Sequence, residues 1–432
     1  MKNFVIFFIF ILAGAGLFLF LKQHNDFQLA QISEITNQME ANQVLIESKA
    51  KQEQAGGANA DISPQRPLEY PPEIIKAIYA TGWSGGYEPR LVYLIDLIKK
   101  TEVNAIVIDI KDYSGELSYR TEIEEVEKYG KGRDLKILHP NAMIKRLHDE
   151  GIYVIARQTI FQDPTLATAR IDLALMSSST KKQWSDNKKV MWVDPASKAV
   201  WDYNILIAKD ALARGFDEVN FDYIRFPTDG KMDDIRYPFW DEVKLKRFVI
   251  RDFWKYLRQA LPEAKMSADL FGLVTVNYGD VGIGQNLDDA FNYFDAIGPM
   301  VYPSHYAPGF DGYKNPAKYP YEIVHRSMIE ANERLKNYIA NAANSTSTEV
   351  YLVKKPQLRP WLQDFDLGVS YDAAKVRAQI MATYVAAGAC EKTATSTDSS
   401  GFFCDPAKEN LIGGWMLWDP KNVYKKEALL AE

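Results

Sequence analysis

Two aspartates in apolar surroundings, Asp222 and Asp269, are the residues of this sequence whose setting best suits acid–base chemistry. Asp222 lies in the stretch Arg214–Pro227, which reads as a helix end, a turn and a buried strand. Gly215 suits the end of the helix, and Pro227 cannot extend a sheet ladder, so the strand stops near Asp222. A carboxylate in such a strand is costly to bury unless it is paired or used.

The combination of carboxylates with few histidines favours glycoside cleavage. The chain has five His and contains neither His-x-His nor His-Glu-x-x-His, which argues against a histidine-rich zinc site. Glycoside cleavage needs one carboxylic acid to protonate the leaving oxygen and a second carboxylate as nucleophile or base. We expect Asp222 to be the ionised partner and Asp269, on a more apolar strand, to be the acid, with no metal and no cofactor. Asp109 and Asp112 are the reserve candidates.

Further polar and aromatic residues follow the ends of the predicted strands, where a substrate would bind. Aromatic rings stack on sugar faces but also fill cores, so packing is the alternative for each aromatic residue. For the reserve aspartates the alternative is a structural ion pair. Arg225 is expected to keep Asp222 ionised, with binding of an acidic sugar as its second interpretation. The predicted substrate-binding residues are Trp83, Asp109, Asp112, Arg157, Arg225, Tyr302, Trp418 and Asp419.

Eight apolar runs alternate with helical patterns and must position these residues. Strands separated by helices imply parallel pairing, so we predict an α/β fold, a (β/α)₈ TIM barrel with its active site at the carboxyl ends of the strands. A doubly wound sheet is the alternative, but no glycine-rich phosphate loop follows the first strand. The predicted strands are Ile74–Ala80, Val103–Ile110, Ile152–Ala156, the strand containing Val219–Asp222, Lys265–Phe271, Ala296–Tyr302, Glu349–Val353 and Gly413–Trp418.

The amino-terminal segment differs from the rest of the chain. Phe4–Leu21 is an unbroken run of apolar or small residues, which favours an uncleaved membrane-spanning helix over a signal peptide. We therefore expect a transmembrane anchor at 1–22, a polar juxtamembrane helix and linker at 23–70, and the barrel domain at 71–432. The protein would be a single-pass protein of the cell membrane with its catalytic domain extracytoplasmic.

Charge and cysteine content narrow the partners and the compartment. The net charge is −6, from 51 basic and 57 acidic side chains with no basic block, so nucleic acid is not expected as a partner. Cys390 and Cys404 flank a Ser/Thr-rich insertion. In an exported domain we expect them to form a disulfide, with two free thiols as the alternative.

Four motifs occur in one order: Tyr79–Trp83, Val107–Asp112, Asn220–Pro227 and Trp415–Pro420. Together they resemble a bacterial family of "putative glycoside hydrolase" domains that was formerly a domain of unknown function. The resemblance covers roughly residues 74–425. It implies a TIM barrel related to the α-amylase-like and neighbouring clans, with a glycosidase activity that is itself inferred for the family.

The segment Gly215–Asp222 is also similar to the fourth-strand motif of chitinase-type barrels, Asp-x-x-Asp-x-Asp-x-Glu. Asp217 and Asp222 match its first and last aspartates. Asn220 replaces the middle aspartate, and Ile224 stands where the catalytic glutamate would be. Without that acid the substrate-assisted chitinase mechanism is not available, so the acid must come from another strand.

These observations predict a membrane-anchored, extracytoplasmic glycoside hydrolase that cleaves a cell-wall or surface polysaccharide. The alternative is a non-catalytic carbohydrate-binding barrel at the cell envelope, which needs aromatic rings and hydrogen bonds but no pair of close acids. A third interpretation is a metal-using lyase or isomerase built on Asp109, Asp112 and Asp222. The second carboxylate and its distance from the first discriminate between catalysis and binding.

Overall fold

The computed structural model describes residues 61–344, 353, 355–392, 402–404 and 413–431. Within these ranges, no helix combines the length and the apolar character that crossing a membrane requires. The anchor predicted at 1–22 and residues 23–60 of the predicted linker lie outside the described residues. The last part of that linker contacts the barrel, because Asp61 accepts the backbone N–H of Asn141 at 2.9 Å and Leu68 donates its N–H to Asp217 at 2.6 Å.

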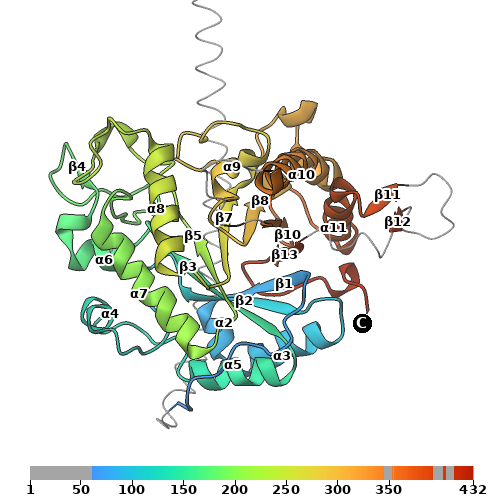
Figure 1. The fold of residues 1–432 in the computed structure, drawn as a ribbon, viewed down its shortest axis with the longest axis horizontal. Helices are drawn as coiled ribbons and strands as arrows, with labels where there is room; N and C mark the ends of the chain where they lie inside the picture. Colours follow the sequence, from blue (N-terminus) through green and yellow to red (C-terminus); the bar gives the residue numbers. More distant parts are fainter. Residues whose placement is uncertain (1–60, 345–352, 354, 393–401, 405–412, 432) are drawn as a thin grey trace, which may run out of the picture.

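Parallel strands form a closed barrel at the centre of the fold (Figure 1). The order around the ring is β10-β13-β1-β2-β3-β5-β7-β8-β9, and pairing of Trp361 with Met300 joins β10 to β8. β9 and β10 are two parts of one strand interrupted near Pro360, so eight strand positions close the ring and the predicted (β/α)₈ barrel is confirmed. The barrel strands are β1 (Ile75–Ala80), β2 (Ala105–Lys111), β3 (Tyr153–Thr159), β5 (Glu218–Asp222), β7 (Met266–Phe271), β8 (Ala296–Met300), β9 (Gln357–Leu358), β10 (Trp361–Gln363) and β13 (Gly414–Trp418).

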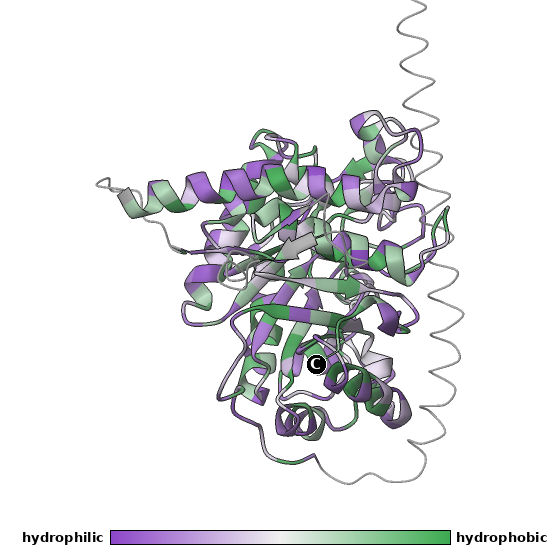
Figure 2. Ribbon diagram, turned by 90° about the vertical axis from the view of Figure 1, so that its right-hand side faces the viewer, coloured by the Kyte–Doolittle hydropathy of each residue, from purple (hydrophilic) through white to green (hydrophobic). Residues whose placement is uncertain are grey.

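Helices surround this barrel on the outside (Figure 1). They are α2 (Gly82–Gly86), α3 (Glu88–Lys99), α4 (Glu124–Tyr129), α5 (Pro140–Asp149), α6 (Pro164–Ala169), α7 (Lys198–Arg214), α8 (Lys246–Ala260), α9 (Leu287–Ala290), α10 (Pro320–Asn344) and α11 (Ala373–Ala387). Gly215 ends α7 with φ of 104°, the left-handed conformation that glycine adopts without steric cost. Figure 2 shows hydrophobic and hydrophilic residues alternating along α10, as expected of a helix with one face on the barrel and one in solvent.

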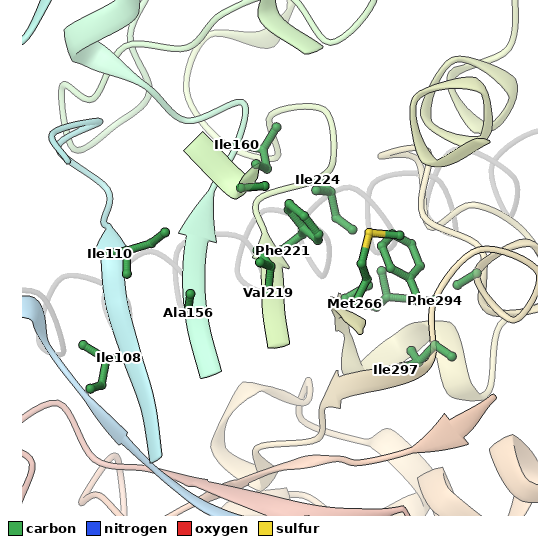
Figure 3. Packing of buried hydrophobic residues seen from close by; sticks show 14 of the residues in the cluster. Ile108, Ile110, Ala156, Ile160, Val219, Phe221, Ile224, Met266, Phe294 and Ile297 are labelled. Carbon is green, nitrogen blue, oxygen red and sulfur yellow. The ribbon is translucent and has the colours of Figure 1, made fainter. Parts of the chain in front are cut away.

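The barrel strands are buried on both faces, which is typical of parallel sheets covered by helices. On β5, Val219 and Phe221 belong to the cluster between strands and helices, which Figure 3 shows. Glu218, Asn220 and Asp222 occupy the other face by the two-residue period of a strand, so they point into the barrel. A second apolar cluster, drawn largely from β1, β2 and β3, fills the rest of the interior.

The seventh strand position is held by β9 and β10. Of the predicted strand Glu349–Val353, residues 349–352 lie outside the described residues, and Val353 is not in a strand. Arg359 follows β9 directly and forms an ion pair with Glu218, at 2.8 and 3.2 Å, at the amino end of β5. Arg359 therefore stabilises the end of the barrel opposite the carboxyl termini of its strands.

The predicted bridge between Cys390 and Cys404 is present as a disulfide. The two cysteines are paired across an antiparallel ribbon formed by β11 (Cys390–Lys392) and β12 (Phe402–Cys404), beside α11. A second ribbon pairs β4 (Met176–Ser177) with β6 (Ile235–Arg236). Both ribbons lie outside the barrel ring.

Candidate active site

Three carboxylates from three strands meet at one guanidinium at the mouth of the barrel, meaning the end formed by the carboxyl termini of its strands. Asp109 comes from β2, Arg157 from β3, Asp222 from β5 and Asp269 from β7. Asp109 pairs with Arg157 in the register of β2 and β3, and Asp222 is the last residue of β5. The barrel therefore brings the predicted pair Asp222 and Asp269 together, with Asp109 beside them.

Arg157 contacts each of these carboxylates through a different nitrogen. Its Nη1 lies 2.5 Å from Asp109 Oδ1, its Nη2 forms an ion pair with Asp222 Oδ2, and its Nε is 3.6 Å from Asp269 Oδ2. Since one cation faces three acids, full ionisation would leave two uncompensated negative charges in a buried site. At least one carboxyl group is therefore driven towards its protonated form.

Asp269 is the carboxyl group in the setting most favourable to a proton. It is 1% exposed. Its Oδ1 accepts hydrogen bonds from Trp361 Nε1 at 2.7 Å and Asn220 Nδ2 at 2.9 Å, which favour the ionised form but are outweighed by burial. Burial first, and the charge of Asp222 second, raise the pKa of Asp269 to about 8. This environment suits a general acid that holds its proton at neutral pH.

Asp222 has the contacts of an ionised group. Its Oδ1 accepts the backbone N–H of Tyr223 at 2.5 Å, and its Oδ2 faces the Arg157 guanidinium. Tyr223 has φ of 53°, a left-handed conformation that is unfavourable for a bulky side chain and that concentrates at functional sites. The strand therefore turns sharply after Asp222, and the strain is stored next to the proposed reacting group.

The two reserve aspartates have different surroundings. Asp109 accepts the hydroxyl of Tyr79 at 2.5 Å as well as the Arg157 contact, and burial raises its pKa. Asp112 instead forms an ion pair with Lys136 and accepts the hydroxyl of Ser114 at 2.6 Å. Burial opposes ionisation of Asp112, but Lys136 and Ser114 lower its pKa overall. Asp109 belongs to the carboxylate cluster, whereas Asp112 makes no ion pair with Arg157.

An aromatic cluster lies beside the carboxylates. Tyr302 and Trp418 have ring centroids 5.3 Å apart, Phe365 is 5.3 Å from Trp418, and Tyr79 is 6.3 Å from it. Trp418 is the half-buried member of this group, so it is the ring with a surface left for a ligand. Tyr302 and Trp418, two of the predicted substrate-binding residues, are thus neighbours at the mouth.

The family of the chain is decided by its sequence. Residues 77–389 match the family described as "Putative glycosyl hydrolase domain". The chain belongs to this family. The matched range includes the whole carboxylate cluster and ends before Trp418.

Solved structures similar to this family member differ widely in identity. A hypothetical protein from Ruminiclostridium thermocellum is 38% identical, with a TM-score of 0.41, over 44% of this chain and 96% of that chain. The PgaB (BpsB) glycoside hydrolase domain from Bordetella bronchiseptica is 14% identical, with a TM-score of 0.51, over 82% and 95%. The α-galactosidase TtGalA from Thermus thermophilus is 12% identical, with a TM-score of 0.45, over 83% and 60%. The second of these supports the fold, and no curated protein matches the sequence.

Three expectations about binding residues of this glycosyl hydrolase domain need correction. Arg225 does not pair with Asp222, because Arg157 takes that position. Trp83 is 1% exposed and packs beside Tyr87, so it offers no face to a sugar. Asp419 is buried and accepts the backbone N–H groups of the turn after β13, while burial raises its pKa to about 7. Its visible contacts are those of a turn-stabilising residue.

Sequence reasoning missed two residues that position the proposed acid of this family member. Trp361 was not singled out, because the seventh strand was predicted at Glu349–Val353 and Trp361 lies after it, in β10. Asn220 was noted only as a replacement in the chitinase-like motif, yet its side-chain amide donates to both Asp269 and Ser267. The inward parity of Asn220, shared with Asp222, was the signal that pointed to such a contact.

The described residues contain no group of three or more His, Cys, Asp or Glu side chains arranged to hold a metal ion. Around the carboxylate cluster, the guanidinium of Arg157 supplies the positive charge. The third interpretation, a metal-using lyase or isomerase, therefore has no support from the arrangement of Asp109, Asp112 and Asp222.

Proposed function

We propose that this protein is a glycoside hydrolase whose catalytic pair is Asp222 and Asp269. The observation that carries the proposal is the contrast between the two carboxyl groups. Asp222 faces the Arg157 guanidinium, whereas Asp269 lies among Trp361, Asn220 and apolar side chains with a raised pKa. Glycoside cleavage requires one carboxyl group that carries a proton and a second one that is ionised. Membership of the glycosyl hydrolase domain family supports the reaction class.

In the proposed reaction, Asp269 donates its proton to the glycosidic oxygen while the bond from that oxygen to the anomeric carbon breaks. Asp222 either attacks the anomeric carbon or removes a proton from the attacking water. If Asp222 attacks, Asp269 then removes a proton from water, and the water oxygen displaces Asp222 from the anomeric carbon, which restores both carboxyl groups. If Asp222 instead removes a proton from the attacking water, Asp222 releases that proton to solvent and Asp269 takes one up before the next cycle. Arg157 contacts both groups, and its 16% side-chain exposure supports a position at the boundary with the substrate.

One observation favours the second candidate, a non-catalytic glycan-binding barrel. The cluster carboxylates are nearly buried, and the same arginine contacts all of them, as in a structural ion-pair network. A binder and an enzyme make different demands on Asp222 and Asp269. A binder tolerates their replacement by the isosteric amides, whereas an enzyme does not.

The test uses a panel of aryl glycosides and soluble polysaccharides with the wild type, Asp222→Asn and Asp269→Asn. We expect both variants to fold and to lose turnover, with Asp269→Asn retaining activity on substrates whose leaving groups need little protonation. Glu218→Gln is the matched control, since Glu218 is a buried carboxylate of the same strand at the opposite end of the barrel. Near-native turnover in both aspartate variants would exclude the assignment, and Asp109 would become the leading candidate.

Rescue by azide distinguishes the roles of the two carboxyl groups. If Asp269 is the acid of a retaining enzyme, azide should rescue Asp269→Ala on an activated aryl glycoside and give a glycosyl azide of retained configuration. If Asp222 is the nucleophile, azide should rescue Asp222→Ala with inverted configuration. A binding protein would give no product in either case.

We further propose that the chain is anchored in the cell membrane by Phe4–Leu21, with the barrel outside the cytoplasm and a cell-wall or surface polysaccharide as substrate. The apolar run supports the anchor, and the disulfide Cys390–Cys404 is typical of an oxidising compartment. The full-length protein should sediment with membranes and be digested by protease added to spheroplasts. A chain recovered from the medium without residues 1–21 would favour a cleaved signal peptide instead.

A further inference from the structure

Arg225 is a buried cation in a largely aromatic setting. Arg225 is 8% exposed. Its Nη1 donates to the carbonyl oxygen of Phe226 at 3.1 Å and to the hydroxyl of Thr228 at 3.3 Å. Both acceptors are neutral. Among the described residues no carboxylate forms an ion pair with this guanidinium, and burial lowers its pKa. Burying an arginine in this way is costly unless an anion completes the site.

Three aromatic rings hold the guanidinium in place. Its central carbon lies 5.0 Å from the ring centroid of Trp192, 5.0 Å from that of Tyr223 and 4.6 Å from that of Phe271. Cation–π contacts fix the position of a guanidinium but leave its N–H groups available for hydrogen bonds. Nε and Nη2 of Arg225 make no hydrogen bond within the described part of the chain, so a planar fork of donors remains for an incoming group.

The ring contacts place Arg225 next to the proposed catalytic pair. Phe271 ends β7 and lies two residues after Asp269, so the two side chains share the inward face of the strand. Tyr223 follows Asp222 directly. The Arg225 guanidinium therefore lies near the carboxyl ends of β5 and β7, close enough to Asp222 for the two charges to interact.

Two acids outside the cluster, Asp229 and Asp186, act on Arg225 through space without forming an ion pair with it. Asp186 accepts Trp192 Nε1 at 3.0 Å, Gln162 Nε2 at 3.1 Å and the backbone N–H of Val190 at 2.9 Å. It influences Arg225 only through space. The Arg225 guanidinium thus forms no ion pair within the described residues, although the charges of Asp222, Asp229 and Asp186 act on it from further away.

We propose that Arg225 binds an anionic substituent of the substrate, so that the enzyme acts on an acidic glycan. This inference rests on the proposed function, because it assumes that the bound glycan is the substrate of a hydrolase. The planar fork of arginine matches the oxygens of a uronic-acid carboxylate or of a sulfate ester. A neutral sugar at the same place would leave the buried charge unpaired.

Binding measured without turnover tests the inference separately from catalysis. Affinity electrophoresis at physiological ionic strength would compare polygalacturonate with its methyl ester, and dextran sulfate with dextran. The first pair reports on a carboxylate and the second on a sulfate ester. The proteins are Asp269→Asn as the inactive parent, and the same parent carrying Arg225→Gln or Arg225→Lys. Arg251→Gln is the matched control, because Arg251 also stacks on a ring, that of Phe248, but on the outer helix α8.

We expect the parent to bind one charged polymer at least about tenfold more tightly than its neutral partner, and Arg225→Gln to abolish this preference. Arg225→Lys should retain part of it, and Arg251→Gln all of it. Equal binding of charged and neutral polymers by the parent, no binding of either charged polymer, or equal loss in Arg225→Gln and Arg251→Gln would overturn the inference. Hydrolysis of neutral glycans alone would refute it while leaving the proposed function intact. Selective binding of a charged polymer with no hydrolysis of any glycan would refute the proposed function and leave the anion-binding role of Arg225 intact.

Discussion

The indole nitrogen of Trp361 donates to Asp269 from two strands away, across β8. Gly298 of β8 is the register partner of Asp269, and a Cβ at Gly298 would lie 3.0 Å from Asp269 Oδ1. The missing side chain therefore leaves the space through which the indole reaches the carboxyl group. Three successive strand positions together set the environment of the proposed acid.

Gly298→Ala should disturb this arrangement directly. The added methyl group would press on Asp269 Oδ1 and on the tip of Met416, so we expect the free energy of unfolding to fall by about 1–3 kcal/mol and turnover to fall with it. Gly279→Ala is the control, since its Cβ would meet only the side chain of Asn277 in an exposed loop. Urea unfolding and initial rates measure both effects. Identical behaviour of the two variants would show that β8 does not constrain the acid.

Trp361→Phe should move the pH dependence of catalysis. The indole hydrogen bond favours the ionised form of Asp269, so its loss should raise the pKa of Asp269 further above about 8. An acid must be protonated to act, so wild-type kcat/KM should fall as pH rises through about 8, and this limb should shift to higher pH in the variant. A pH–rate profile on an activated aryl glycoside measures the shift. A limb that moves to lower pH would contradict the assignment.

Asp269 should also make stability depend on pH. Because its pKa is raised in the folded protein, the native state binds more protons than the unfolded state between about pH 4 and pH 8. The free energy of unfolding should therefore fall as pH rises through this window. Asp269→Asn should remove that contribution while keeping an acceptor for Trp361 and Asn220. Denaturant titrations at several pH values would show it, with Asp96→Asn, an exposed acid on α3, retaining the wild-type slope.

Arg157→Met should be strongly destabilising. It removes the only ion-pair partner that Asp109, Asp222 and Asp269 have within the described residues, and breaking a buried pair on one side costs about 3–5 kcal/mol. Arg326→Met is the control, because its pair with Glu330 on α10 is partly exposed to solvent and should contribute about 1 kcal/mol or less. Thermal and urea unfolding compare the two. Similar small losses would mean that the three carboxylates are held neutral without Arg157.

Much of this fold was predictable because β-strand parity and helix periodicity are local signals. The inward direction of Asp222, the stop after it and the glycine at 215 follow from short-range geometry, and the structure agrees with each. The seventh strand was misplaced because Pro360 divides it, and sheet pairing across that interruption depends on the neighbouring strands.

The contacts of individual side chains were harder to predict. Which arginine would face Asp222 depended on the register of β3 against β5, and no pattern near Arg225 or Arg157 reveals it. Trp83 has the same local appearance as a surface platform residue, yet the packing of α2 hides it. Parity gives the face of a strand, but the partner on that face comes from residues far away in the sequence.

The seam of the barrel between β8 and the divided seventh strand consists of three register pairs, and Trp361 with Met300 is the pair at its carboxyl end. Trp361, which belongs to this seam, is also the residue that donates to Asp269. Any transient unzipping of this seam would carry the indole away and expose the carboxyl group to bulk water. Amide hydrogen exchange along β10 and loss of the buried environment of Asp269 should then have the same opening free energy. An opening at this seam would therefore abolish the proposed proton donation by Asp269.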